Sequence, residues 1–136
     1  MSNIVTIFKN IKETSTPFHR DATIILSRIK DGTSKDLVKK IRSEKKKNER
    51  NELKKSLPAV CFSGIFNKRS DNSLVEHSGL ICLDFDGYDK QSDLLQDKQK
   101  LSENKFVYSV FISPSGNGLK VLVKIPPDAD NHQNYF

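Results

Sequence analysis

The segment SGLICLDFDGYD, residues 78–89, constrains the fold most, because an apolar run leads directly into two carboxylates. Leu80 to Leu83 are consecutive apolar residues next to turn residues, a pattern typical of a buried strand. Asp84 and Asp86 follow with one residue between them, and Gly87 begins the turn. Side chains two apart on a strand point to the same face, so the two carboxylates would project together. Three interpretations are open: a divalent-metal site, a phosphatase nucleophile with its acid, or a polar strand end.

The composition indicates a globular protein with a preference for polyanionic partners. With 136 residues, 35% hydrophobic and 29% charged, the chain has the length and composition of one globular domain. The net charge of +6 favours polyanionic partners, above all nucleic acid, because binding of Lys and Arg to phosphates releases counterions. The two cysteines lie in apolar runs and are expected to be buried thiols. Since the chain shows no signal peptide or membrane-length apolar run, we expect a cytoplasmic protein without a membrane partner.

The apolar patterns predict an α+β domain with a mainly antiparallel sheet and helices packed on it. The expected elements are a strand over 3–8, a helix over 21–30, a second helix from about 34, strands over 59–66 and 78–86, a helix over 92–104, and strands over 105–113 and 119–126. The last two strands flank PSGNG, which predicts a hairpin with a glycine-containing loop. We expect one domain over residues 1–136, truncated at its C-terminus.

A nearly continuous charged run, KKIRSEKKKNERNELKK over residues 39–55, predicts a basic helix over about 34–56. Its basic excess is comparable to that of the whole chain. Two compatible interpretations are a solvated helix with Glu–Lys pairs and a helix that meets a nucleic-acid backbone. The candidate nucleic-acid contacts are Lys39, Lys40, Arg42, Lys45, Lys46, Lys47, Arg50, Lys54, Lys55 and, in a later loop, Lys68 and Arg69.

The hairpin segment SPSGNGLK, residues 113–120, is the second candidate site. Its glycines allow the backbone to approach a ligand closely, and exposed amides beside a serine and a lysine favour a phosphate cradle. Alone, the same residues also make an ordinary hairpin loop. Together with the two carboxylates they favour a nucleotide-phosphate site with Mg²⁺ or Mn²⁺, the ions suited to carboxylate and phosphate oxygens. The predicted phosphate ligands are Ser113, Ser115, Gly116, Asn117, Gly118 and Lys120.

The motif LDFDG is also similar to the nucleophile strand of haloacid-dehalogenase-like phosphatases. Asp84 would then be the nucleophile and Asp86 the acid. Those enzymes resemble doubly wound sheets with a long stretch after the motif, whereas only 50 residues follow Asp86 here. The phosphatase is therefore a third alternative.

Three segments carry a more specific resemblance: LKKSLPAVCFSGIFNKR, LVEHSGLICLDFDGYD and VFISPSGNGLKVLVKIP. With the opening IVTIFKNIKETSTP, they resemble the VirE N-terminal domain family of mobile-element and phage replication proteins. That family is similar to the catalytic core of archaeo-eukaryotic primases and primase-polymerases, which implies an RRM-like core. The resemblance implies that Asp84 and Asp86 hold the metals. It also implies that the predicted nucleotide-phosphate contacts include Ser115, Gly116, Gly118 and Lys120.

Two departures from that pattern stand out. Lys120 lies where the primase superfamily usually has a histidine, and the third acidic motif does not occur before residue 136. The chain would be a primase-like or polymerase-like nucleotidyltransferase only if residues beyond 136 complete the site. In that case the resemblance implies catalytic roles for Asp84 and Asp86, a DNA or RNA template, a nucleoside triphosphate, and a helicase domain or protein as a further partner. The alternative is a non-catalytic nucleic-acid-binding module that keeps the fold.

Overall fold

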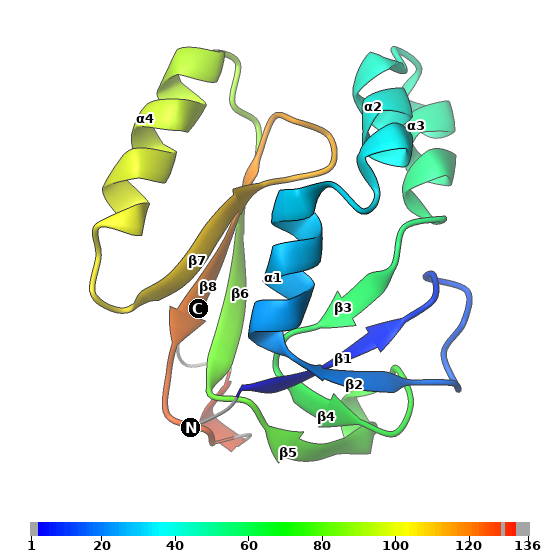
Figure 1. Cartoon of the computed structure of the whole chain (residues 1–136), viewed down its shortest axis with the longest axis vertical. Helices are drawn as coiled ribbons and strands as arrows, with labels where there is room; N and C mark the ends of the chain where they lie inside the picture. The colour runs from blue at the N-terminus through cyan, green and yellow to red at the C-terminus, as the bar shows by residue number, and fades with distance from the viewer. Residues whose placement is uncertain (1–2, 129, 133–136) are drawn as a thin grey trace. The chain divides into compact units, whose positions relative to one another are not determined.

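The computed structural model describes residues 3–128 and 130–132 (Figure 1). The chain divides into two compact units, Met1–Ser78 and Gly79–Phe136. The described residues form four α-helices, and every strand pair among them is antiparallel, which confirms the predicted α+β class. No helix in this part of the chain is long and apolar enough to cross a membrane. The prediction of a single domain over 1–136 stays a prediction.

The first unit contains two small antiparallel sheets. Its strands are β1 (Ile4–Phe8), β2 (Phe18–Asp21), β3 (Ala59–Cys61), β4 (Gly64–Phe66) and β5 (Leu74–His77). β1 lies between β2 and β3 in one sheet, and β4 pairs with β5 in the other after a short 3-10 turn (Asp71–Ser73). The fully buried Thr6 joins the two sheets, since its Oγ1 donates to Gly64 O and accepts from Phe66 N, both at 2.9 Å.

The segment over 59–66, predicted as one strand, forms two. Phe62 and Ser63 form the turn between them, and β3 pairs with β1 whereas β4 pairs with β5. The prediction also missed β2, whose sequence FHRD has a single apolar residue and mostly exposed side chains. A strand with so little apolar alternation gives no period-two signal.

The first unit also holds α1 (Ala22–Asp31), α2 (Lys35–Ser43) and α3 (Lys47–Lys54). The prediction of one continuous basic helix over 34–56 is wrong, because the chain is extended at Glu44 and Lys46. The Glu44 side chain accepts a hydrogen bond from Lys46 N at 3.0 Å, which satisfies a backbone donor outside the helix. Ile41 is the only buried residue of α2, and α3 has none, so little packing forces the helix to continue.

The second unit is a three-stranded sheet covered on one face by a helix (Figure 1). Its elements are β6 (Leu80–Phe85), α4 (Gln91–Ser102), β7 (Val107–Ile112) and β8 (Leu119–Lys124), with β8 between β6 and β7. Leu94 of α4 packs in one buried cluster with Leu119 and Val121 of β8. Because side chains alternate along a strand, Lys120 points to the face of the sheet opposite α4.

Candidate functional site

The sheet face opposite α4 carries predicted site residues in two adjacent rows. In the first row, Lys120 of β8 lies between Asp84 of β6 and Phe111 of β7. The second row continues this register beyond the strand ends and consists of Asp86, Gly118 and Ser113. Ser113 N donates to Gly118 O at 2.9 Å, which fixes that register. The fold therefore brings both predicted metal ligands onto one face with three of the predicted phosphate ligands.

The first row contains an ion pair between directly opposed residues. Lys120 Nζ lies 3.0 Å from Asp84 Oδ1. The side chains are 33% and 52% exposed, respectively, so solvent reaches both charges. An ion pair of this exposure contributes little to folding stability. A ligand could replace either partner at small cost to the fold.

The second row has no side chain at its centre. A Cβ at Gly118 would lie 2.7 Å from Asp86 Oδ1 and 3.2 Å from Ser113 Oγ. The Asp86 carboxylate and the buried Ser113 hydroxyl therefore lie against the Cα of Gly118. Only glycine at this position lets the carboxylate approach the hairpin so closely.

The hairpin loop between β7 and β8 is closed by its own backbone. Gly116 has the left-handed φ of 84°, and its amide donates to Ser113 O at 2.9 Å. The amide of Gly116 is thus already used inside the turn. The amides of Ser115, Asn117 and Gly118 donate to no acceptor within the described part of the chain. Gly118 is buried, whereas Ser115 and Asn117 reach solvent, so the amides of Ser115 and Asn117 are the ones that a phosphate could take.

Tyr88 links this loop to the segment after β6, and the sequence reasoning missed it. Its amide donates to Asn117 O at 2.9 Å, and its hydroxyl donates to Asp97 of α4 at 2.8 Å. The hydrogen bond to the Asp97 carboxylate raises the pKa of the tyrosine. The only signal in the sequence was an aromatic residue directly after DFDG. Tyr88 thereby fixes the hairpin loop beside the segment that carries Asp86.

A half-buried thiol lies in the next row of the same face, and neither cysteine is fully buried as the sequence predicted. Cys82 is two residues before Asp84 on β6 and opposite Leu122 of β8. The pKa of Cys82 is raised to about 11, mainly by burial and also by the Asp84 carboxylate, whereas Lys120 acts to lower it. The charges of the ion pair therefore act on the thiol, whose high pKa makes it a poor nucleophile.

The protein offers few ligands for a metal. No group of three or more His, Cys, Asp or Glu side chains is close enough together to hold an ion among residues 3–128 and 130–132. Asp84 and Asp86 supply carboxylate oxygens only. Mg²⁺ is often held by one or two carboxylates while water and substrate phosphates complete its shell. The two aspartates fit a cation that arrives with a phosphate ligand, and not a cage built by protein alone.

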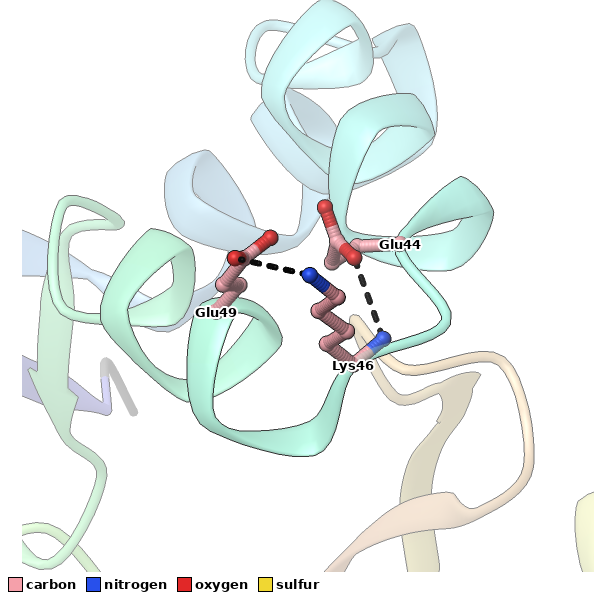
Figure 2. A network of polar contacts seen from close by, with 3 residues as sticks. All are labelled: Glu44, Lys46 and Glu49. Carbon is pink, nitrogen blue, oxygen red and sulfur yellow. Dashed lines mark hydrogen bonds and ion pairs between the residues drawn. The ribbon is translucent and has the colours of Figure 1, made fainter.

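The predicted nucleic-acid contacts lie mainly on α2, α3 and the turn between them, in the first unit. Residues 35–55 hold ten Lys or Arg and four Asp or Glu, an excess of six that equals the net charge of the whole chain. Figure 2 shows the turn, where Lys46 contacts Glu44 through its amide and Glu49 through its Nζ at 3.8 Å. Arg50 Nε donates to Glu44 O at 3.2 Å and so braces the same turn.

The basic residues predicted to contact nucleic acid differ in whether their side chains already interact within the chain. Lys55 pairs with Glu52 at 2.6 Å, and Arg69 donates to Ile11 O at 2.7 Å. Arg42 also has an interaction within the chain, and Lys54 is partly buried. The predicted contacts that are exposed and make no side-chain hydrogen bond or ion pair with described residues are Lys39, Lys40, Lys45, Lys47 and Lys68.

These features define an α+β protein with an exposed carboxylate–lysine pair beside a glycine-containing hairpin loop. The chain belongs to the family described as BT4734-like, N-terminal domain, whose model matches residues 52–135, more than half of the chain. The matched range contains both rows of the candidate site. No curated protein and no solved structure matches the chain.

The family match overturns the resemblance drawn from the sequence segments. The chain is not assigned to the VirE N-terminal domain family, because the matching model is that of a different family. The primase-like expectation therefore loses the relationship on which it depended. What remains is the chemistry of the residues themselves.

Proposed function

We propose that the chain binds a nucleoside triphosphate together with a divalent cation on the two-row face, and that nucleotidyl transfer is the chemistry of this site. The observation that carries the proposal is the placement of Asp84, Lys120 and Asp86 on one sheet face beside the hairpin loop. Carboxylates bind the cation, and a lysine and backbone amides bind phosphate oxygens. A phosphate ligand that arrives with a divalent cation needs both kinds of group at once.

The positively polarised groups of the site would bind the phosphates, and the carboxylates would bind the cation. Lys120 and the amides of Ser115 and Asn117 would hold the phosphates. Asp84 and Asp86 would hold Mg²⁺ or Mn²⁺, which supplies charge neutralisation at the phosphates when bound. In the reaction, a 3′-hydroxyl oxygen forms a bond to the α-phosphorus, the bond from that phosphorus to the bridging oxygen breaks, and pyrophosphate leaves. The hydroxyl proton passes to solvent.

A nucleic-acid template is the proposed second partner. The exposed lysines of α2, α3 and their connecting turn support it, because exposed cations without an intramolecular partner are available to phosphate oxygens. The choice between DNA and RNA, a helicase domain or protein as a further partner, and a cytoplasmic location stay predictions.

A second candidate function is nucleic-acid binding without catalysis. It is favoured by the concentration of the whole net charge in residues 35–55 and by the small number of metal ligands among the described residues. This module would bind nucleic acid with no dependence on a divalent cation.

Nucleotide binding to the full chain separates the two candidates. Titration of a fluorescent ATP analogue by anisotropy should show binding in Mn²⁺ but not in EDTA, and the Asp84→Asn, Asp86→Asn double variant should lose it. The matched control is Asp93→Asn with Glu103→Gln, which removes two negative charges from α4 and its C-cap and should bind like the wild type. Metal-independent DNA binding without nucleotide binding would identify the non-catalytic module and reject the nucleotidyltransferase.

A further inference from the structure

The ammonium group of Lys120 contacts a carboxylate oxygen of Asp84 that a divalent cation would also bind. Its Nζ is 3.0 Å from Asp84 Oδ1, and hard cations take carboxylate oxygens as ligands. We propose that Lys120 is an internal counter-ion of Asp84 that must leave when the cation binds, and that the released Nζ then binds the nucleotide phosphate. This inference rests on the proposed function and specifies how the two ligands depend on each other.

The formal charges give the direction of this dependence. Asp84, Asp86 and Lys120 together carry two negative charges and one positive charge. Without a cation, this net negative charge gives the face little attraction for a nucleotide. A divalent cation reverses the sign, and the triphosphate then meets a positive face. A free cation, in contrast, must both displace the lysine and remain close to its charge.

The geometry allows the lysine to change partners without a change of fold. Strand β8 is paired on both sides at Lys120, with Asp84 on β6 and Phe111 on β7, so the backbone is fixed. The ion pair is exposed and is therefore weak. Gly118, two residues earlier on the same face, places the second row within reach of the flexible lysine stem.

Metal and nucleotide should therefore strengthen each other's binding. Each ligand removes part of the obstacle to the other, and linkage requires the effect to be equal in both directions. A neutral side chain at position 120 should have opposite effects on the two ligands. It should tighten the binding of the cation alone, because the competitor is gone, and weaken the binding of the nucleotide with the cation, because a phosphate contact is gone.

The test compares Lys120→Met with the wild-type full chain. Binding of Mn²⁺ alone is measured from the electron paramagnetic resonance signal of free Mn²⁺, and binding of ATP at fixed Mn²⁺ by calorimetry. We expect Mn²⁺ alone to bind about fivefold tighter and ATP about tenfold weaker, within the usual range of coupling between two sites. Lys124→Met is the matched control. It removes the same charge from the same face of β8, opposite Leu80, and should change neither affinity by more than about twofold.

The possible results are distinguishable. An unchanged or weaker Mn²⁺ affinity in Lys120→Met overturns the inference, while the proposed function stands if wild-type ATP binding still requires Mn²⁺ and Asp86. No ATP binding by the wild type in Mn²⁺ overturns both. Equal effects of Lys120→Met and Lys124→Met also overturn the inference, because net charge alone would then explain them. Lys120→Gln replaces Lys120→Met if thermal unfolding shows that the methionine variant is not folded.

Discussion

Gly118 leaves the space that the Asp86 carboxylate occupies. A Cβ at position 118 would lie 2.7 Å from Asp86 Oδ1 and 2.9 Å from Phe85 O. The carboxylate could rotate away from the new atom, but the Phe85 carbonyl is backbone and could not. Any side chain at this position must therefore displace both the end of β6 and the carboxylate that follows it.

Gly118→Ala should accordingly weaken nucleotide binding in Mn²⁺ by an amount on the order of tenfold, or about 1.4 kcal/mol. Overpacking of this kind should also lower the free energy of unfolding by about 1–3 kcal/mol. Calorimetry measures the first effect and urea denaturation the second. Gly118→Ala with unchanged nucleotide affinity would show that Asp86 does not need its position beside the hairpin.

A destabilised variant in the other unit controls for loss of stability alone. Gly32 ends α1 with a left-handed φ of 77°, and alanine there costs about 1 kcal/mol of stability. Gly32→Ala should lose stability and keep nucleotide affinity. If both variants lose affinity equally, general destabilisation explains the result.

The alkylation rate of the Cys82 thiol should depend on the charges of Asp84 and Lys120 in the first row. Its pKa of about 11 is roughly two units above the ordinary 9.0, so alkylation at pH 8 should be about 100-fold slower than for an ordinary thiol. The thiolate forms as pH rises, so the rate should increase until about pH 11. The experiment uses the Cys61→Ser background, which leaves Cys82 as the only cysteine.

Substitutions in the ion pair should shift that rate in opposite directions. Asp84 raises the pKa of Cys82, so Asp84→Asn should speed alkylation by iodoacetamide. Lys120 lowers the same pKa, so Lys120→Met should slow it. The rate constants, measured from pH 7 to pH 10, should rank Asp84→Asn above the wild type and Lys120→Met below it. The reverse order would mean that access to the thiol, and not charge, controls its reactivity.

The sequence predicted those elements whose apolar pattern is strong. Leu80 to Leu83 predicted the buried part of β6, and the PSGNG loop between two β-branched runs predicted the β7–β8 hairpin. Alternation also placed the two aspartates on one face. The opposition of Asp84 to Lys120 could not be predicted, because it depends on strand register, and two apolar strands of similar length fit several registers.

The remaining differences between the predictions and the structure come from individual hydrogen bonds that no periodic pattern in the sequence reveals. Lys and Glu have similar helix propensities along residues 35–55, so propensity gives no reason to break the helix at Glu44. The break is made by the Glu44 carboxylate, which accepts from Lys46 N, and by Arg50, which donates to Glu44 O. Tyr88 was missed for a similar reason, since its role depends on a tertiary contact with Asn117.

The exposed lysines of α2 and α3 should contribute to nucleic-acid affinity through counterion release. Lys39, Lys40 and Lys47 are exposed and are not paired with a described carboxylate. Changing all three to Gln should reduce the slope of log K against log salt for duplex DNA by about 2 to 3, since each lost contact removes about 0.9. Anisotropy titrations measure this slope between roughly 50 and 200 mM salt, the range in which phosphate contacts strongly change the affinity.

A charge-matched variant tests whether position matters. Lys98, Lys100 and Lys105 lie on α4 and in the segment before β7, in the second unit. Changing these three to Gln removes the same net charge and should leave the slope nearly unchanged. Equal slopes for the two triple variants would show that binding follows net charge and not the surface of α2 and α3.

The Thr6 hydroxyl should be the main polar link between the two sheets of the first unit. Thr6 is fully buried, and its Oγ1 bonds with Gly64 O and Phe66 N. Thr6→Val keeps the shape of the side chain but leaves both backbone groups without this partner. We expect the free energy of unfolding to fall by about 2 kcal/mol or more, because buried polar groups without hydrogen bonds are costly.

Thr6→Ser separates the hydroxyl from the methyl group of the same side chain. Serine keeps both hydrogen bonds and loses one buried methyl, which costs about 0.8 kcal/mol. Urea denaturation followed by circular dichroism should therefore rank the wild type first, Thr6→Ser second and Thr6→Val last. A valine variant at least as stable as the serine variant would mean that Gly64 O and Phe66 N find other partners or water. In that case the two sheets would be held together mainly by apolar packing, and the buried hydroxyl would contribute little.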